Sequence, residues 1–87
     1  MSLPVTLADG EGEANAFDGE RLSCVLSRAF APGAPVELAV VLQGTSLALR
    51  AKAVGSKRTP DDRFAVTLRL VNLRRVHREA LRSALPG

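Results

Sequence analysis

A change of hydrophobic period near the C-terminus constrains the fold of this chain more than any other feature. Over residues 63–70 apolar residues alternate with others, so that one face of an extended chain carries Phe64, Val66, Leu68 and Leu70. This period of two is typical of a strand with one face against a core. From Leu73 onward the spacing of apolar residues becomes three to four, which is typical of a helix. The sequence therefore predicts a strand over residues 63–70 and a helix over about 73–85.

The predicted helix combines an apolar stripe with a cationic surface. Its apolar stripe consists of Leu73, Val76, Ala80, Leu81, Ala84 and Leu85. The basic residues around the stripe are Arg74, Arg75, Arg78 and Arg82. Asn72 is a suitable N-cap residue, and Pro86 followed by Gly87 is a typical stop.

The preceding part of the chain divides into short extended segments between turn signals. Strands are predicted at residues 5–7, 13–17 and 22–26, with turns at 9–12 and at Asp18 and Gly19. Residues 29–35 hold two prolines and therefore form a loop, with Phe30 as an apolar plug. Residues 36–42 and 47–54 form a hairpin around a turn at 43–46, and residues 55–62 are a polar connection. We expect residues 1–11 to be partly flexible.

These elements predict a mainly β fold. The 87 residues make a single domain, residues 1–87, that buries roughly 60–65% of its unfolded surface. The five or six short strands and one terminal helix favour a closed or nearly closed antiparallel β-barrel with a C-terminal α-helix, because closure hides the strand edges that an open sheet exposes. A two-layer sheet with the helix across one face is the competing architecture.

Composition indicates where the chain resides. A single cysteine cannot form an internal disulfide, which favours a reducing compartment. No apolar run approaches ~18 residues and no signal sequence opens the chain, so we expect a cytoplasmic protein without membrane insertion.

No residue cluster in the sequence indicates catalysis. His77 lies among arginines on the predicted helix, with no carboxylate placed to orient it. Cys24 falls on the apolar phase of its strand, which favours a buried structural thiol over a nucleophile. Together they fall short of the four ligands of a structural zinc site. We therefore predict no enzymatic activity, no metal site and no cofactor.

Charge is unevenly distributed along the chain. Residues 1–20 hold five acids and no Lys or Arg, whereas residues 21–87 hold twelve bases and four acids. Either this is an asymmetric solvated surface, or a basic face meets an anionic partner. The first segment is expected to fold across the basic remainder. A basic stripe could involve Arg50, Lys52, Lys57, Arg58 and Arg69.

A nucleic-acid partner is an alternative that the composition disfavours. Binding of single strands commonly uses exposed aromatic side chains for stacking, and the chain has three Phe and no Trp or Tyr. Phe64 is in phase with the core, Phe30 plugs a loop and Phe17 is ambiguous.

The sequence of elements resembles a PilZ domain over about residues 12–85. The resemblance is carried by residues 29–38 with their proline and glycine, by residues 49–54 at the end of the hairpin, and by residues 63–70 followed by a helix with Leu81 and Leu85. It implies a six-stranded barrel with a C-terminal helix. It also implies a bacterial protein of a family in which many members are receptors for cyclic di-GMP.

The ligand motifs of that family are missing from their places. PilZ receptors carry Arg-x-x-x-Arg before the first barrel strand, but no basic residue precedes Arg21. Their Asp/Asn-x-Ser-x-x-Gly motif would fall on residues 16–21, which keep none of its defining residues. Asp18 stands where the family has Ser, and its charge would repel a phosphate. The spacing recurs among Arg74, Arg78 and Arg82, but a helix places residues four apart on one row regardless of function.

A retained scaffold without its ligand motifs predicts a PilZ-like regulatory or adaptor module. Such a module would act in bacterial motility or envelope signalling by contacting another protein, with little or no binding of cyclic di-GMP. One alternative is a divergent cyclic di-GMP receptor that uses Arg21 and Arg28. Others are a small-barrel nucleic-acid-binding protein and a homodimer formed through outer strand residues such as Val25 or Val41.

Overall fold

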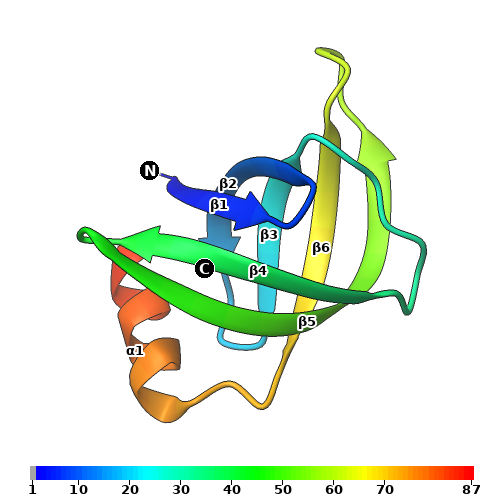
Figure 1. The fold of residues 1–87 in the computed structure, drawn as a ribbon. Coiled ribbons are helices and arrows are strands. Elements are labelled where there is room, and N and C mark those ends of the chain that lie inside the picture. The colour runs from blue at the N-terminus through cyan, green and yellow to red at the C-terminus, as the bar shows by residue number, and fades with distance from the viewer. Residues whose placement is uncertain (1) are drawn as a thin grey trace.

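The chain folds into a closed antiparallel barrel of six strands, followed by one helix (Figure 1). The structure is a computed structural model that describes residues 2–87. The strands are β1 Leu3–Leu7, β2 Gly10–Phe17, β3 Arg21–Leu26, β4 Pro35–Leu42, β5 Thr45–Arg58 and β6 Phe64–Val71, and helix α1 is Arg75–Ala84. Around the barrel the order is β1-β2-β3-β6-β5-β4. The prediction of a mainly β, six-stranded antiparallel barrel with a C-terminal helix is confirmed.

Strand β1 closes the barrel. It pairs with β2 over its whole length and with β4 from Val5 opposite Val40 to Leu7 opposite Leu38. Leu3, Val5 and Leu7 are buried while the two residues between them are exposed. Residues 3–7 thus supply both ladder hydrogen bonds and core side chains. Met1 lies outside the described residues.

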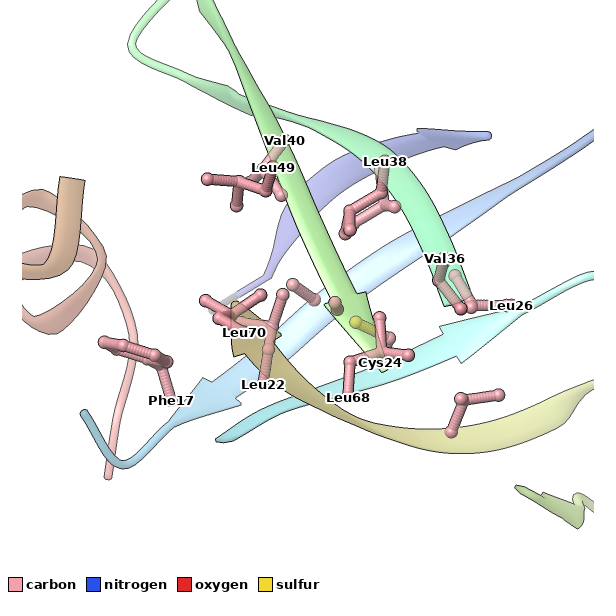
Figure 2. Packing of buried hydrophobic residues seen from close by; sticks show 14 of the residues in the cluster. Phe17, Leu22, Cys24, Leu26, Val36, Leu38, Val40, Leu49, Leu68 and Leu70 are labelled. Atoms are coloured by element: carbon pink, nitrogen blue, oxygen red, sulfur yellow. The ribbon is translucent and has the colours of Figure 1, made fainter. Parts of the chain in front are cut away.

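Alternate residues of every strand fill the barrel interior. Figure 2 shows part of this core, in which Phe17 lies beside α1 and Leu26 and Val36 lie towards the other end. The buried residues of residues 2–87 are all apolar. Phe17, ambiguous from the sequence, is 2% exposed, whereas Phe30 and Phe64 are partly buried against the core. Burial of these alternating faces is the main stabilising contribution to the fold.

Strand β5 is longer than the sequence predicts. The alternation breaks at Val54, because this residue is an extra one between the pairs Ala53 opposite Leu68 and Gly55 opposite Thr67. Such a β-bulge bends the strand, and in Figure 1 β5 changes direction within its length. The expected polar connection at residues 55–62 is therefore wrong. Its polar residues up to Arg58 still pair with β6, and only residues 59–63 connect the two strands.

The two short hairpins are tighter than expected. Ala8 and Asp9 alone connect β1 to β2, and Gln43 and Gly44 alone connect β4 to β5. Gln43 and Gly44 have φ of 50° and 79°. A two-residue turn with positive φ at both residues has a backbone twist that matches the twist of the two strands it connects.

Helix α1 lies across one end of the barrel, which we call the helix end (Figure 1). Leu81 and Leu85 are buried in the barrel core, and the Phe17 N–H donates a 2.8 Å hydrogen bond to the Pro86 carbonyl oxygen. Val76, predicted to be part of the apolar stripe, is 59% exposed. Five residues before Leu81, it lies about 140° around the helix from that side chain.

The expected N-cap at Asn72 is also wrong. The N-cap residue is Arg74, whose side chain makes no capping hydrogen bond. Asn72 instead has φ of 53° and turns the chain out of β6 before the helix begins. Asn tolerates this left-handed conformation better than most residues do, which explains its place in the turn.

Candidate functional site

The two arginines considered for a divergent ligand site lie far apart: Arg21 begins β3, and Arg28 lies two residues beyond its end. Arg28 follows Arg21 by seven positions, which is on the order of 20 Å along an extended chain. The Arg28 guanidinium pairs with the Asp9 carboxylate and lies 4.4 Å from the centroid of the Phe30 ring. Arg21 instead stands opposite Arg69 of β6. The structure therefore separates Arg21 from Arg28 and brings Arg21 to other cations.

Residues 16–21, which correspond to the second family motif, form the end of β2 and its turn into β3. The Asp18 carboxylate accepts hydrogen bonds from the backbone N–H of Arg21 at 2.7 Å and of Glu20 at 2.9 Å. These bonds lower the pKa of Asp18, so its side chain is anionic at neutral pH. Asp18 thus stabilises a turn and presents negative charge where the family has Ser.

The acids of the first twenty residues fold against the basic remainder, as expected. Three of the five form ion pairs with it, namely Asp9 with Arg28, Glu13 with Arg63 and Glu20 with Arg69. Six of the 12 Lys and Arg residues have no ion pair within the described chain. These six are Arg21, Lys52, Lys57, Arg74, Arg78 and Arg82.

Three neighbouring strands of the barrel, β3, β6 and β5, place like charges side by side. In the ladder of β3, β6 and β5, Arg21 stands opposite Arg69, and Arg69 stands opposite Lys52. All three side chains are exposed on the outer face. Within residues 2–87 only Arg69 of these three has an acidic partner, with its Nε 3.3 Å from a Glu20 carboxylate oxygen. Like charges directly opposite each other destabilise a sheet, so this row costs stability.

A surface hollow of about 480 Å³ surrounds Lys52 and Arg69. We call it the Lys52 hollow; its lining residues are Gly33, Lys52, Ala53, Val54, Arg69, Leu70, Val71 and Asn72. Val54 and Val71 are 43% and 37% exposed, and they are two of the three large apolar residues exposed among those described. Each follows a cation by two residues on its strand, so it points to the same outer face. The hollow therefore combines two cations with two exposed valines.

A second hollow, of about 240 Å³, adjoins the first through Val71 and Asn72. We call it the His77 hollow; its other lining residues are Ala48, Leu49, Arg50, Leu73, Arg74 and His77. It lies between β5 and the start of α1. The first turn of α1 contains no acidic residue, although a negative charge there would stabilise the helix by interacting with the positive end of its dipole. The basic surface thus continues from the barrel onto the helix.

A third hollow, of about 450 Å³, lies on the outer surface near Phe30 and the start of β4. Its charged lining residues are Asp9, Glu37 and Arg50. Asp9 already pairs with Arg28, and Glu37 pairs with Arg50 at 3.5 Å. Because these charges are neutralised internally, this hollow offers less to a charged ligand than the Lys52 hollow does.

The sequence predicted the cations of this surface but not its valines. Arg50 and Lys52 do share one face of β5, and Arg69 joins them directly. Lys57 and Arg58, expected in a loop, lie instead in β5 beyond the bulge. Val71 could have been found, since it follows the inward Leu70 in an alternating strand. Val54 could also have been found, since it continues the outward phase of Arg50 and Lys52 in the alternation of β5.

The reactive side chains do not form a chemical centre. Cys24 is 2% exposed, and burial raises the pKa of its thiol to about 12, which leaves it protonated. His77 is half-buried in the His77 hollow. Within residues 2–87 no three His, Cys, Asp or Glu side chains are grouped to hold a metal ion. Helix α1 is too short and too polar to cross a membrane.

The residues suggested for a homodimer do not form one surface. Val25 and Val41 are both half-buried on the outer face, but β3 and β4 are not neighbours in the barrel. Two strands separate them in either direction around it. A single dimer interface containing both is therefore not present.

Comparison of the chain with protein-family models, curated proteins and solved structures finds no match.

Proposed function

We propose that this protein is a PilZ-like regulatory or adaptor module of bacterial cyclic di-GMP signalling, in motility or envelope control. It acts by contacting another protein and binds little or no cyclic di-GMP itself. One observation carries the proposal: the chain has the six-stranded barrel and C-terminal helix that the resemblance implies, while residues 16–21, where the second ligand motif would fall, form a turn held by the anionic Asp18.

The arrangement of Arg21 and Arg28 supports the absence of a ligand site. Arginines bind phosphates best when their planar guanidinium groups converge on the same anion. Here Arg21 begins β3 while Arg28 lies two residues beyond its end, and Arg28 is already paired with Asp9. The anionic Asp18 adds repulsion at the β2–β3 turn.

Calorimetric titration with cyclic di-GMP tests this proposal. We expect no saturable heat with the native protein. Saturable one- or two-site binding with micromolar affinity would overturn it in favour of the divergent receptor. In that case Arg21→Ala and Arg28→Ala would each abolish the heat, whereas Arg58→Ala, which removes an exposed arginine of β5, would not.

Nucleic-acid binding remains the candidate of another class, favoured by the row of Arg21, Arg69 and Lys52. The burial of Phe17 and the partial burial of Phe30 and Phe64 leave no free aromatic side chain for stacking in residues 2–87. Gel-shift assays with single-stranded RNA and DNA at low ionic strength decide this. A shift that weakens steeply with salt supports that candidate, and its absence excludes it.

A further inference from the structure

The Lys52 hollow has the chemistry of a docking site. We propose that it binds an acidic segment of a partner protein that also carries apolar side chains. The carboxylates of that segment pair with Lys52 and Arg69, and an apolar side chain lies against Val54 and Val71. This inference rests on the proposed function, since it assigns a surface and a partner chemistry to the protein contact.

The two cations of the Lys52 hollow repel each other across the β5–β6 ladder. Lys52 stands opposite Arg69 on neighbouring strands, and Lys52 has no acidic partner within the described residues. A carboxylate placed between the Lys52 ammonium group and the Arg69 guanidinium group would attract both and so offset their repulsion. Charge complementarity therefore specifies an anion at this position.

The neighbouring cation of β5 already has a carboxylate partner on β4. Two residues earlier on β5, Arg50 pairs with Glu37 at 3.5 Å across the β4–β5 ladder. The residue of β4 opposite Lys52 is Pro35, which offers no charge. Arg50 therefore has a carboxylate partner within the protein. Lys52 has none on β4 and is available to a carboxylate of another molecule.

Val54 and Val71 give the Lys52 hollow an apolar surface. Both are exposed beyond a third of their surface, while the other large apolar residues of the barrel are buried or partly buried. They lie beside Arg69 and Lys52 on the same face, and both line the hollow. Burying two valines against an apolar side chain is favourable, and it excludes water from the adjoining ion pairs.

A protein segment fits this surface better than a nucleic acid does. The hollow has no aromatic lining residue on which a base could stack. Glu20, at 3.3 Å from Arg69, borders the row and would repel a continuous phosphate backbone. A segment with separate carboxylates and apolar side chains can pair with Lys52 while its apolar groups face the valines.

Titration with a defined probe tests the proposal. The probe is a fluorescein-labelled nine-residue peptide of alternating glutamate and leucine, followed by anisotropy and by backbone amide shifts of the labelled protein, up to about 1 mM peptide. Comparison peptides replace every glutamate by glutamine, or every leucine by serine. We expect the parent peptide to bind at least about tenfold more tightly than either, with shifts centred on residues 52–54 and 69–72.

Two lysines of one strand provide a matched pair of variants. Lys52 and Lys57 are both exposed on β5 and both lack an ion pair within the described residues. Lys52→Glu is expected to weaken peptide binding by roughly tenfold, whereas Lys57→Glu, with the same change of net charge, leaves it within about twofold. Urea denaturation of both variants verifies that each remains folded.

Several outcomes overturn the inference. These are equal weakening by the two lysine variants, equal affinity for the glutamine peptide, absence of binding at the highest concentration, and preferential binding of an RNA oligonucleotide or of vesicles containing phosphatidylglycerol. None of these results depends on the cyclic di-GMP titration. If neither cyclic di-GMP nor the peptide binds, the proposed function stands and only the assigned surface is wrong.

Discussion

Lys52 and Arg69 face each other across the β5–β6 ladder, both exposed and both cationic. Cross-strand neighbours of opposite charge stabilise a sheet, whereas like charges directly opposite destabilise it. The pair therefore works against the fold at a place where either residue could have been polar and uncharged. Such local conflicts are expected where a surface serves binding.

Replacing Lys52 by glutamate should stabilise the protein. Lys52→Glu places a carboxylate opposite Arg69, and we expect the free energy of unfolding to rise by about 0.2–1 kcal/mol. Urea denaturation at low ionic strength measures this. Lys57 stands opposite Ala65, so Lys57→Glu should give no comparable gain. A destabilised Lys52→Glu variant would show that the like-charge row does not cost stability.

A capping residue at position 74 should also stabilise the protein. Arg74 occupies the N-cap position with extended backbone and makes no capping bond. Arg74→Asp supplies an acceptor for the first N–H groups and removes a cation from the positive end of the helix dipole, for a gain of about 1 kcal/mol. Arg78→Asp, with the same charge change one turn into α1, is the control and should give no gain. Thermal and urea unfolding of both variants provide the comparison.

Substitutions on opposite faces of α1 should differ sharply in cost. Leu81 is fully buried and Val76 is 59% exposed. Leu81→Ala leaves a cavity and should lower the free energy of unfolding by about 3 kcal/mol, whereas Val76→Ala should change it by less than about 0.5 kcal/mol. Equal effects in urea denaturation would mean that α1 does not seal the helix end of the barrel.

Two glycines should respond differently to alanine. A Cβ at Gly12 would lie 2.0 Å from the Val25 carbonyl oxygen and 2.8 Å from Leu26 Cα, and backbone atoms cannot move aside cheaply. We expect Gly12→Ala to cost at least about 3 kcal/mol, or to prevent folding. At Gly55, beside the bulge, a Cβ would meet nothing within 4 Å. Gly55→Ala should therefore be neutral or slightly stabilising, and circular dichroism with urea titration distinguishes the two.

Stability should decline at alkaline pH because of Cys24. Burial raises the pKa of its thiol from the ordinary value of 9.0 to about 12. Above pH 9.0 the unfolded thiol ionises while the folded one stays neutral, so the free energy of unfolding falls as pH rises towards about 12. A single proton contributes a slope of at most about 1.4 kcal/mol per pH unit.

Cys24→Ala provides the control for this dependence. The variant should be less stable at neutral pH, because it leaves a small cavity in the core, but its stability should decline less between pH 9 and about 11. Urea titrations at a series of pH values measure both slopes. Identical slopes would assign the decline to groups other than this thiol.

Local sequence patterns determined most of the barrel strands. The inward residues of β6 follow the alternation of residues 63–70, because a strand can bury only one of its two faces in a closed barrel. The hairpin of β4 and β5 was predicted for the same reason. Where the pattern failed, a backbone feature had intervened: the bulge at Val54 shifted the phase of β5, and the positive φ of Asn72 moved the start of α1 to Arg75.

What only the tertiary structure decided is which side chains meet. Residue types and phases in the sequence placed Lys52 and Arg69 on exposed strand faces, but no periodicity reveals which residue of β6 stands opposite which residue of β5. Register depends on hydrogen-bond pairing across the barrel and on the bulge within it. The sequence by itself therefore determined a barrel with exposed cations, and the pairing of its strands determined that two of those cations share a hollow with two valines.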